Sequence, residues 1–167
     1  WSSDVCSSDL KTNLKNGERF ICTVLDGKKI NDMFKEKDQI IGSKDGINIW
    51  EINKNYNVQN LDDNENSLGL EIKVKLSSTG VVHTEYILNI DYIKTVFSQN
   101  DFDCEGEFNF SDYYSEKFNL SQSEKDYSFL SKVLVFTKKD MTKNNIINEI
   151  IENIVRDEQF DKKMDDK

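Results

Sequence analysis

Five acidic side chains gather within twelve residues, at Asp101, Asp103, Glu105, Glu107 and Asp112. In an extended strand, alternate residues point to the same side and lie about 6.5–7 Å apart. The first four carboxylates would then form one row, and we call these four residues the acidic row. Their spacing is close to that of phosphates along a nucleic-acid strand, so the row could fill a basic groove on a partner protein. We predict all five acidic residues as partner-binding residues; a solvated acidic edge that discourages aggregation is the alternative.

The same segment resembles the calcium-binding loop of EF-hand proteins over residues 101–112. Carboxylates stand at loop positions 1, 3, 5 and 12, and Gly106 stands at position 6, where the loop turns sharply. Position 12 is an aspartate, which is shorter than the usual glutamate. The resemblance implies an alternative function as a calcium-binding module, with Asp101, Asp103, Glu105 and Asp112 as the metal ligands.

A second metal pattern is the strand triplet Glu71-Ile72-Lys73, with Asp62 and Asp63 upstream. It resembles the acidic and Glu-x-Lys core of restriction-endonuclease-like nucleases. That resemblance implies that the acids would hold Mg²⁺ while Lys73 orients a water molecule. A metal-dependent nuclease that uses Glu71 and Lys73 is therefore the second alternative. The same triplet also arises on the solvated face of a strand in a chain rich in Lys and Glu.

Other catalytic patterns are missing from the sequence. His83 is the only histidine, and we expect it beside Glu85 on the outward face of a strand. The sequence has no glycine-rich phosphate loop and no G-x-S-x-G motif. We therefore expect no catalytic residues, no cofactor in the leading hypothesis, and a protein that is not an enzyme.

Charge and hydropathy narrow the choice of partners. The chain has 167 residues, with 22 basic and 31 acidic side chains, for a net charge of −9. A surplus of acid argues against direct nucleic-acid binding, because there is no basic excess to displace counterions. No apolar run approaches the roughly 18 residues that span a bilayer. We expect a cytoplasmic protein, either of a cell or of an infected host cell, with no membrane contact.

Hydrophobic spacing indicates the elements that position these residues. Leu70, Ile72, Val74 and Leu76 alternate with polar residues, which is typical of a strand with one buried face. Residues 53–68 are rich in asparagine and are expected to form a loop. The other expected elements are strands at 18–25 and 129–137, hairpins at 39–52 and 70–90, and helices at 30–37 and 91–100.

The last expected element is a long amphipathic helix. Its apolar positions recur at helical spacing, at Ile146, Ile147, Ile150, Ile151, Ile154 and Val155. Such a stripe belongs on a sheet. We therefore predict an α+β fold: an antiparallel sheet of about five to seven strands with a long C-terminal amphipathic helix packed on one face.

The ends of the chain are set apart from this domain. The sequence has no Pro or Ala and is rich in Lys, Asn and Ile, which indicates an AT-rich gene everywhere except in Trp1–Leu10. That segment resembles a translated sequencing adapter, so we treat residues 1–10 as a disordered assembly artefact. Residues 11–160 are expected to form one α+β domain, and residues 161–167 a frayed tail.

Together these observations favour a small acidic, non-enzymatic binding protein. We expect it to dock an acidic surface on a larger basic macromolecule, such as a nucleic-acid-handling enzyme, as inhibitors and immunity-type proteins do. An AT-rich gene is compatible with a microbial or phage origin and with an anti-defence role. The calcium module and the metal-dependent nuclease remain the alternatives.

Overall fold

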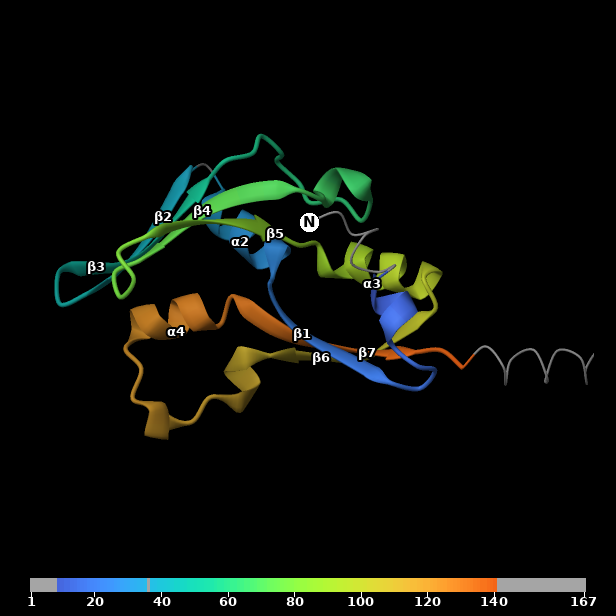
Figure 1. The fold of residues 1–167 in the computed structure, drawn as a ribbon. Coiled ribbons are helices and arrows are strands. Elements are labelled where there is room, and N and C mark those ends of the chain that lie inside the picture. Colours follow the sequence, from blue (N-terminus) through green and yellow to red (C-terminus); the bar gives the residue numbers. More distant parts are fainter. Residues whose placement is uncertain (1–8, 36, 141–167) are drawn as a thin grey trace, which may run out of the picture.

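A computed structural model describes residues 9–35 and 37–140, which form two antiparallel sheets, one above the other in Figure 1. The upper sheet has four strands in the order β2-β3-β4-β5, and the lower sheet has three in the order β1-β7-β6. The strands are β1 (Arg19–Leu25), β2 (Gln39–Lys44), β3 (Ile47–Lys54), β4 (Leu70–Leu76), β5 (Val82–Ile87), β6 (Phe102–Asn109) and β7 (Ser131–Lys138).

The described helices are short. Residues 9–13 are helical, and single 3-10 turns occur at Glu65–Ser67 (η1), Phe110–Tyr113 (η2) and Glu116–Phe118 (η3). The labelled α-helices are α2 (Gly27–Phe34), α3 (Ile90–Gln99) and α4 (Gln122–Ser128).

The predicted single sheet with a long packed helix is therefore wrong. The chain instead divides its strands between two sheets because β1 pairs with β7, which is far away in sequence, and not with β2. Within the described ranges the inner sheet faces are covered by the short helices α2 and α3, whose apolar residues enter the two cores. The predicted stripe from Ile146 to Val155 lies outside the described residues.

Both predicted hairpins are confirmed. β2 and β3 pair across a turn at Asp45-Gly46, where both residues have positive φ, and β4 pairs with β5 across a turn that ends at Gly80. Ile72 and Val74 are buried as the alternation predicted. Glycine at positions 46 and 80 meets the steric demand of a positive φ. The helix at 91–100 and the strand at 129–137 also form, each within two residues of the predicted bounds.

Helix α2 begins earlier than the predicted helix. Its N-cap is Asp26, since the Asp26 side chain accepts a hydrogen bond from the backbone N–H of Lys29 at 3.2 Å. An aspartate before the first turn stabilises a helix by satisfying an unpaired N–H group. Asn31 instead donates from its side chain to the carbonyl of Gln59, and so fixes the predicted loop to the helix.

Each sheet has its own core. Under the four-stranded sheet lie Ile52 and Ile72 with Ile30 and Phe34 of α2, all fully buried. Over the three-stranded sheet, α3 contributes Phe97, which stacks on Phe136 with ring centroids 4.3 Å apart and meets Phe102 edge-on at 5.6 Å.

The two sheets meet at the junction between β1 and α2. The backbone N–H of Asp26 donates to the carbonyl of Leu130, and that of Gly27 donates to the carbonyl of Leu88. A Cβ at position 27 would lie 2.6 Å from the Leu88 oxygen, so this close approach requires glycine. The junction fixes the end of the lower sheet against the chain that leaves β5.

Candidate functional site

The acidic segment lies on β6, at one edge of the three-stranded sheet. Residues 102–109 are extended, as the acidic row requires, but the pairing with β7 shifts between Cys104 and Gly106. This β-bulge inserts Glu105 and reverses the alternation after it. Asp103 lies opposite Thr137, whereas Glu107 lies opposite the buried Leu134, so their side chains leave opposite faces of the sheet.

Every carboxylate of the acidic row has a cation from the same chain. Asp103 meets Lys139 at 3.2 Å and Glu105 meets Arg19 at 3.0 Å. Asp101 pairs with Lys11 at 2.5 Å, while Glu107 contacts Lys94 at 2.6 Å and Lys132 at 2.5 Å. Each of the four negative charges thus has a positive partner, and two of these partners, Lys94 and Lys132, also contact Asp91 and Asp26. Such a surface presents little net negative potential to a basic partner.

Glu107 belongs to an ion-pair chain that enters the protein. Lys132 joins its carboxylate to that of Asp26, 3.2 Å away, whose side chain is only 8% exposed. On the other side, Lys94 joins Glu107 to Asp91, and Lys28 joins Asp91 to Asp63. The hydrogen bond from Lys132, followed by that from Lys94, holds the pKa of Glu107 below its usual range. This arrangement links β6, β7, α3 and the start of α2.

The backbone of residues 102–112 differs from that of an EF-hand calcium loop. Residues 102–109 form a strand and Phe110–Tyr113 form a 3-10 turn, so the segment lacks the loop that folds around an ion in an EF-hand. Asp112 is engaged with its own segment, since it accepts hydrogen bonds from the Asn109 backbone at 3.3 Å and side chain at 3.1 Å. The described ranges contain no group of three His, Cys, Asp or Glu side chains placed to hold a metal ion.

The nuclease-like residues do not converge either. Glu71 and Lys73 pair with each other at 2.7 Å on the solvated face of β4, and the Asn55 side chain donates to Glu71 at 2.6 Å. Asp63 instead pairs with Lys28 and accepts a hydrogen bond from Asn89 at 2.8 Å. The Lys73 hydrogen bond lowers the pKa of Glu71, so this carboxylate is held ionised by a neighbour on its own strand.

His83 lies on the opposite face of β5 from the one we predicted. It pairs with the buried Val74, so its side chain leaves on the same face as Val74, but His83 is itself exposed, as expected of a surface residue. β5 is an edge strand, and only its last residue, Ile87, is buried. A cleft of about 300 Å³ between β1 and β5 is lined mainly by residues of β1, together with Glu85 and Tyr86 of β5.

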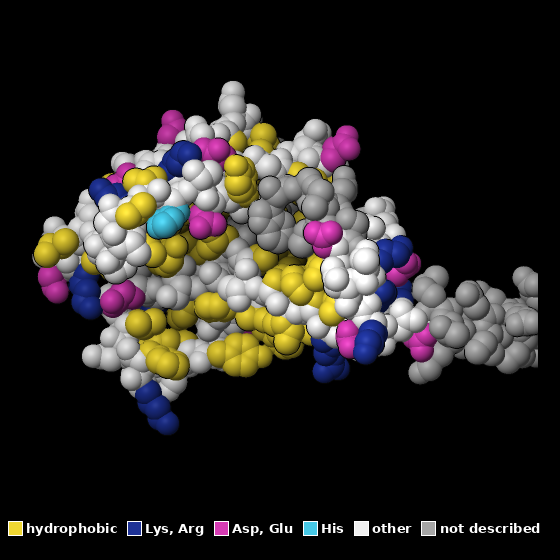
Figure 2. Space-filling view, in the orientation of Figure 1, with side chains coloured by type: hydrophobic (Ala, Val, Ile, Leu, Met, Phe, Trp, Pro, Cys, Tyr) yellow, Lys and Arg dark blue, Asp and Glu magenta, His cyan; other side chains and the backbone are white. Residues whose placement is uncertain are grey.

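The most exposed aromatic surface lies on a segment that the sequence analysis did not select. A groove of about 350 Å³ opens between η2, η3, α4 and the start of β7. Tyr113 is 65% exposed and Phe118 is 64% exposed. In Figure 2, hydrophobic side chains gather on the lower part of the face shown, where the three-stranded sheet and the segment after β6 lie. We call this surface the aromatic groove and define it by Phe110, Tyr113, Tyr114, Phe118, Leu120 and Phe129.

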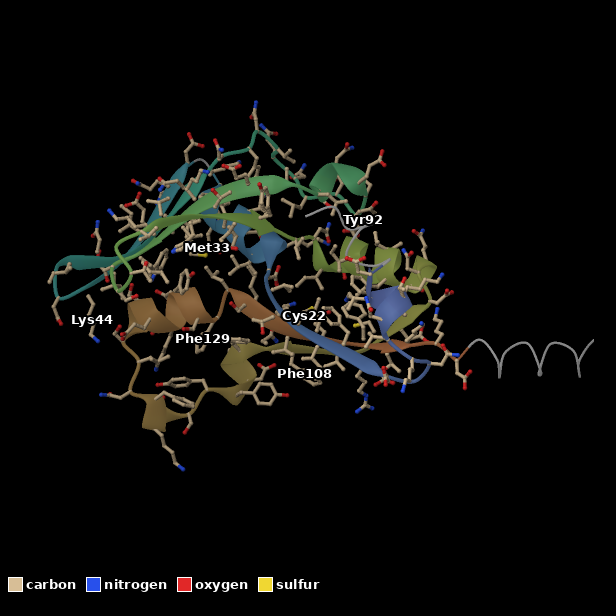
Figure 3. All side chains as sticks on the ribbon, in the orientation of Figure 1. Cys22, Met33, Lys44, Tyr92, Phe108 and Phe129 are labelled. Carbon is tan, nitrogen blue, oxygen red and sulfur yellow. The ribbon has the colours of Figure 1, made fainter. Side chains whose placement is uncertain are left out.

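The rings of the aromatic groove are arranged by their own neighbours. Tyr114 meets Phe129 edge-on at 5.8 Å and lies beside Phe118 at 6.4 Å, while Tyr113 meets Phe108 edge-on at 6.1 Å. Figure 3 shows Phe108 and Phe129 on the side of the sheet where this segment lies. The available signal in the sequence was the density of aromatic residues between Phe108 and Phe118.

Comparison with known proteins adds no family. No protein-family model matches the chain, and no curated protein matches it significantly. Among the residues with described positions, no helix combines the length and apolar character needed to cross a membrane. The functional interpretation therefore rests on the surfaces of the molecule itself.

Proposed function

We propose that this chain is a small acidic, non-enzymatic binding protein that docks on a basic macromolecular partner. The observation that carries the proposal is the aromatic groove, with Tyr113 and Phe118 each about two-thirds exposed on a chain with a net charge of −9. Exposed aromatic residues are enriched where proteins bind other proteins, because a large apolar ring gains free energy when a partner removes it from water.

The sign of the partner's charge follows from that of the chain. A net charge of −9 repels a second copy and attracts a cationic protein over a distance of about one Debye length, roughly 8 Å in physiological salt. Near the groove, four acidic side chains are matched by four lysines, so the attraction comes from the net charge of the whole chain: Asp112, Glu116, Glu124 and Asp126 lie beside Lys29, Lys44, Lys117 and Lys125. Electrostatic attraction of this kind increases the association rate and selects against acidic partners.

The acidic row would contribute less attraction for a basic partner than the sequence alone suggested. Its members are held by lysine and arginine side chains of this chain, so a partner's cation would have to displace an existing ion pair. Exposed ion pairs are weak, about 0–1 kcal/mol each, so exchange is feasible at Asp103 and Glu105 but yields little net attraction. Partner binding by the row stays a prediction, and the inhibitor or immunity-type role stays part of the proposal.

The test is capture of the partner followed by reconstitution. The purified chain is immobilised, proteins of the source organism are passed over it in low and high salt, and the retained protein is identified, purified and titrated back. We expect a basic protein whose affinity falls as salt increases. Retention of acidic or neutral proteins alone, or a salt-independent affinity, would contradict the proposal. A partner covalently altered by the chain would show that the chain is an enzyme.

A further inference from the structure

We infer that the aromatic groove receives a short segment of the basic partner that presents two or three apolar side chains flanked by lysine or arginine. This inference rests on the proposed function and names the surface and the partner chemistry. The groove, of about 350 Å³, lies at the small end of the range of binding sites and suits a few side chains, not a whole helix bundle. Its lining is aromatic, and aromatic-lined grooves bind peptide segments by packing and by attraction to cations.

The groove is preorganised for such a segment. Asn109 and Asp112 form a reciprocal cap on η2, and Ser121 and Glu124 form another on α4, where Glu124 accepts hydrogen bonds from the Ser121 hydroxyl at 2.6 Å and backbone at 2.8 Å. Ser115 caps η3. Because these caps fix the turns that carry the rings, less conformational entropy is lost when a partner binds.

One contact within the segment shows that the groove accommodates a cation. The Lys125 ammonium lies over the Tyr114 ring, 4.4 Å from its centroid, and 3.7 Å from the Glu116 carboxylate. Glu116 is 87% exposed, so most of its surface is available to a second cation. A ring face and a carboxylate together attract lysine or arginine more strongly than either one alone. A partner lysine or arginine would bind here by replacing Lys125, whose contacts show the chemistry that this position takes.

The apolar surface continues beyond the groove onto the outer face of the three-stranded sheet. Val133 lines the groove and pairs with Phe108 on β6 and Thr23 on β1, while the neighbouring Val135 pairs with Ile21. Phe108 is 39% exposed and Ile21 is 63% exposed. A segment bound in the groove could therefore extend along the outer face of the sheet. Its side chains beyond the groove would then also contact apolar surface.

The chain's net charge decides between a partner and a second copy. In a symmetric dimer, two copies with a net charge of −9 each would have to associate through the same surface. Like charges across an interface raise the free energy of association. A cationic segment turns the same field into an attraction. The inference therefore commits to a basic, apolar peptide segment of the partner.

The test uses the full chain and two short fluorescent peptides that share one leucine pattern, with lysine at the polar positions of one and glutamate at those of the other. Fluorescence anisotropy gives the affinities. We expect the lysine peptide to bind at least about tenfold more tightly than the glutamate peptide.

The double variant Tyr113→Ser, Phe118→Ser should weaken lysine-peptide binding about tenfold. The matched control is Ile47→Ser, Val82→Ser, which removes two exposed apolar side chains from the four-stranded sheet and should change the affinity less than twofold.

Three results would overturn the inference: equal weakening in the groove and control variants, equal affinity for the two peptides, or the absence of binding. A cross-link from the groove to residues 146–155 of the same chain would show a different occupant, as would dimerisation that the groove variant abolishes. The captured partner separates the two proposals. If the groove variant retains it with unchanged, salt-dependent affinity, the groove is not the surface although the proposed function stands. If the wild-type chain captures no basic protein, the proposed function fails.

Discussion

Lys132 and Glu107 form an ion pair between neighbouring strands, with Nζ 2.5 Å from the carboxylate. The β-bulge before Gly106 makes this contact possible, because it turns Glu107 to the face of the sheet that carries Leu134. Lys132 also reaches Asp26, whose side chain is 8% exposed and caps α2. One lysine therefore bridges two carboxylates where the two sheets meet, and this role leads to the first prediction.

Replacing Lys132 should destabilise the protein more than replacing an exposed lysine. In Lys132→Met the stem of the side chain is kept, but the nearly buried Asp26 loses its cation, at a cost of about 2–3 kcal/mol in the free energy of unfolding. Urea denaturation measures this change. Lys117→Met is the matched control, since Lys117 is exposed on η3, and should shift the free energy of unfolding by less than about 0.5 kcal/mol. Equal effects would mean that Lys132 does not stabilise Asp26.

The members of the acidic row should differ in their effect on stability. Glu107→Gln removes a charge that two lysines contact and should cost about 1.5–3 kcal/mol. Asp103→Asn affects one pair in which the aspartate is 65% exposed, and should cost about 0–1 kcal/mol. Thermal and urea unfolding of the two variants compare them directly. A row of equivalent surface charges predicts equal, small effects, so that result would contradict the role assigned to Glu107.

This difference shows where prediction from sequence stopped. The alternation of acidic and apolar residues was compatible with an extended segment at 101–109, and residues 102–109 do form a strand. It could not predict the bulge, because an extra residue in a strand depends on how β7 pairs with it across 20 or more intervening positions. Nor could it predict the lysine partners, which come from Lys11, Lys94 and Lys139 on separate elements.

The sheets also show that local elements could be predicted from the sequence, whereas pairing between distant segments could not. Local hairpins such as β4–β5 follow from alternation and a glycine turn, and they were predicted. The pairing of β1 with β7 joins segments more than 100 residues apart, so no local pattern specifies it. The aromatic groove, by contrast, is lined by one continuous segment, residues 110–133, which runs from the end of β6 into β7.

Gly42 should not tolerate alanine. A Cβ at this position would lie 2.1 Å from the indole of Trp50, which is 5% exposed and donates from Nε1 to the Ser123 carbonyl at 2.7 Å. The indole cannot move without losing that bond, so Gly42→Ala should cost about 2–3 kcal/mol and alter Trp50 fluorescence.

Gly106→Ala is the matched control for Gly42→Ala. Its Cβ would lie 2.4 Å from the Phe108 ring, but this ring is 39% exposed and can rotate toward solvent. The expected cost is therefore about 1 kcal/mol or less, measured by the same urea denaturation. A larger loss for Gly106→Ala than for Gly42→Ala would mean that the Trp50 indole can move away from β2.

The capping box of α4 should give Glu124 an unusual titration. Hydrogen bonds from the Ser121 side chain, the Ser121 backbone and Lys44 lower the pKa of Glu124 from 4.5 to about 2. Because the folded-state pKa is lower than the ordinary one, the stabilisation is present above about pH 4.5 and is lost as the pH falls toward 2. NMR titration of the side-chain carboxyl should therefore give a pKa near 2 in the wild type and a value closer to 4.5 in Ser121→Ala. Gln122→Ala is the control, because Gln122 bonds Asp126 and should leave the Glu124 pKa unchanged. An ordinary pKa in the wild type would show that the cap is open in solution, and the ordering of the aromatic groove by this cap would then be wrong.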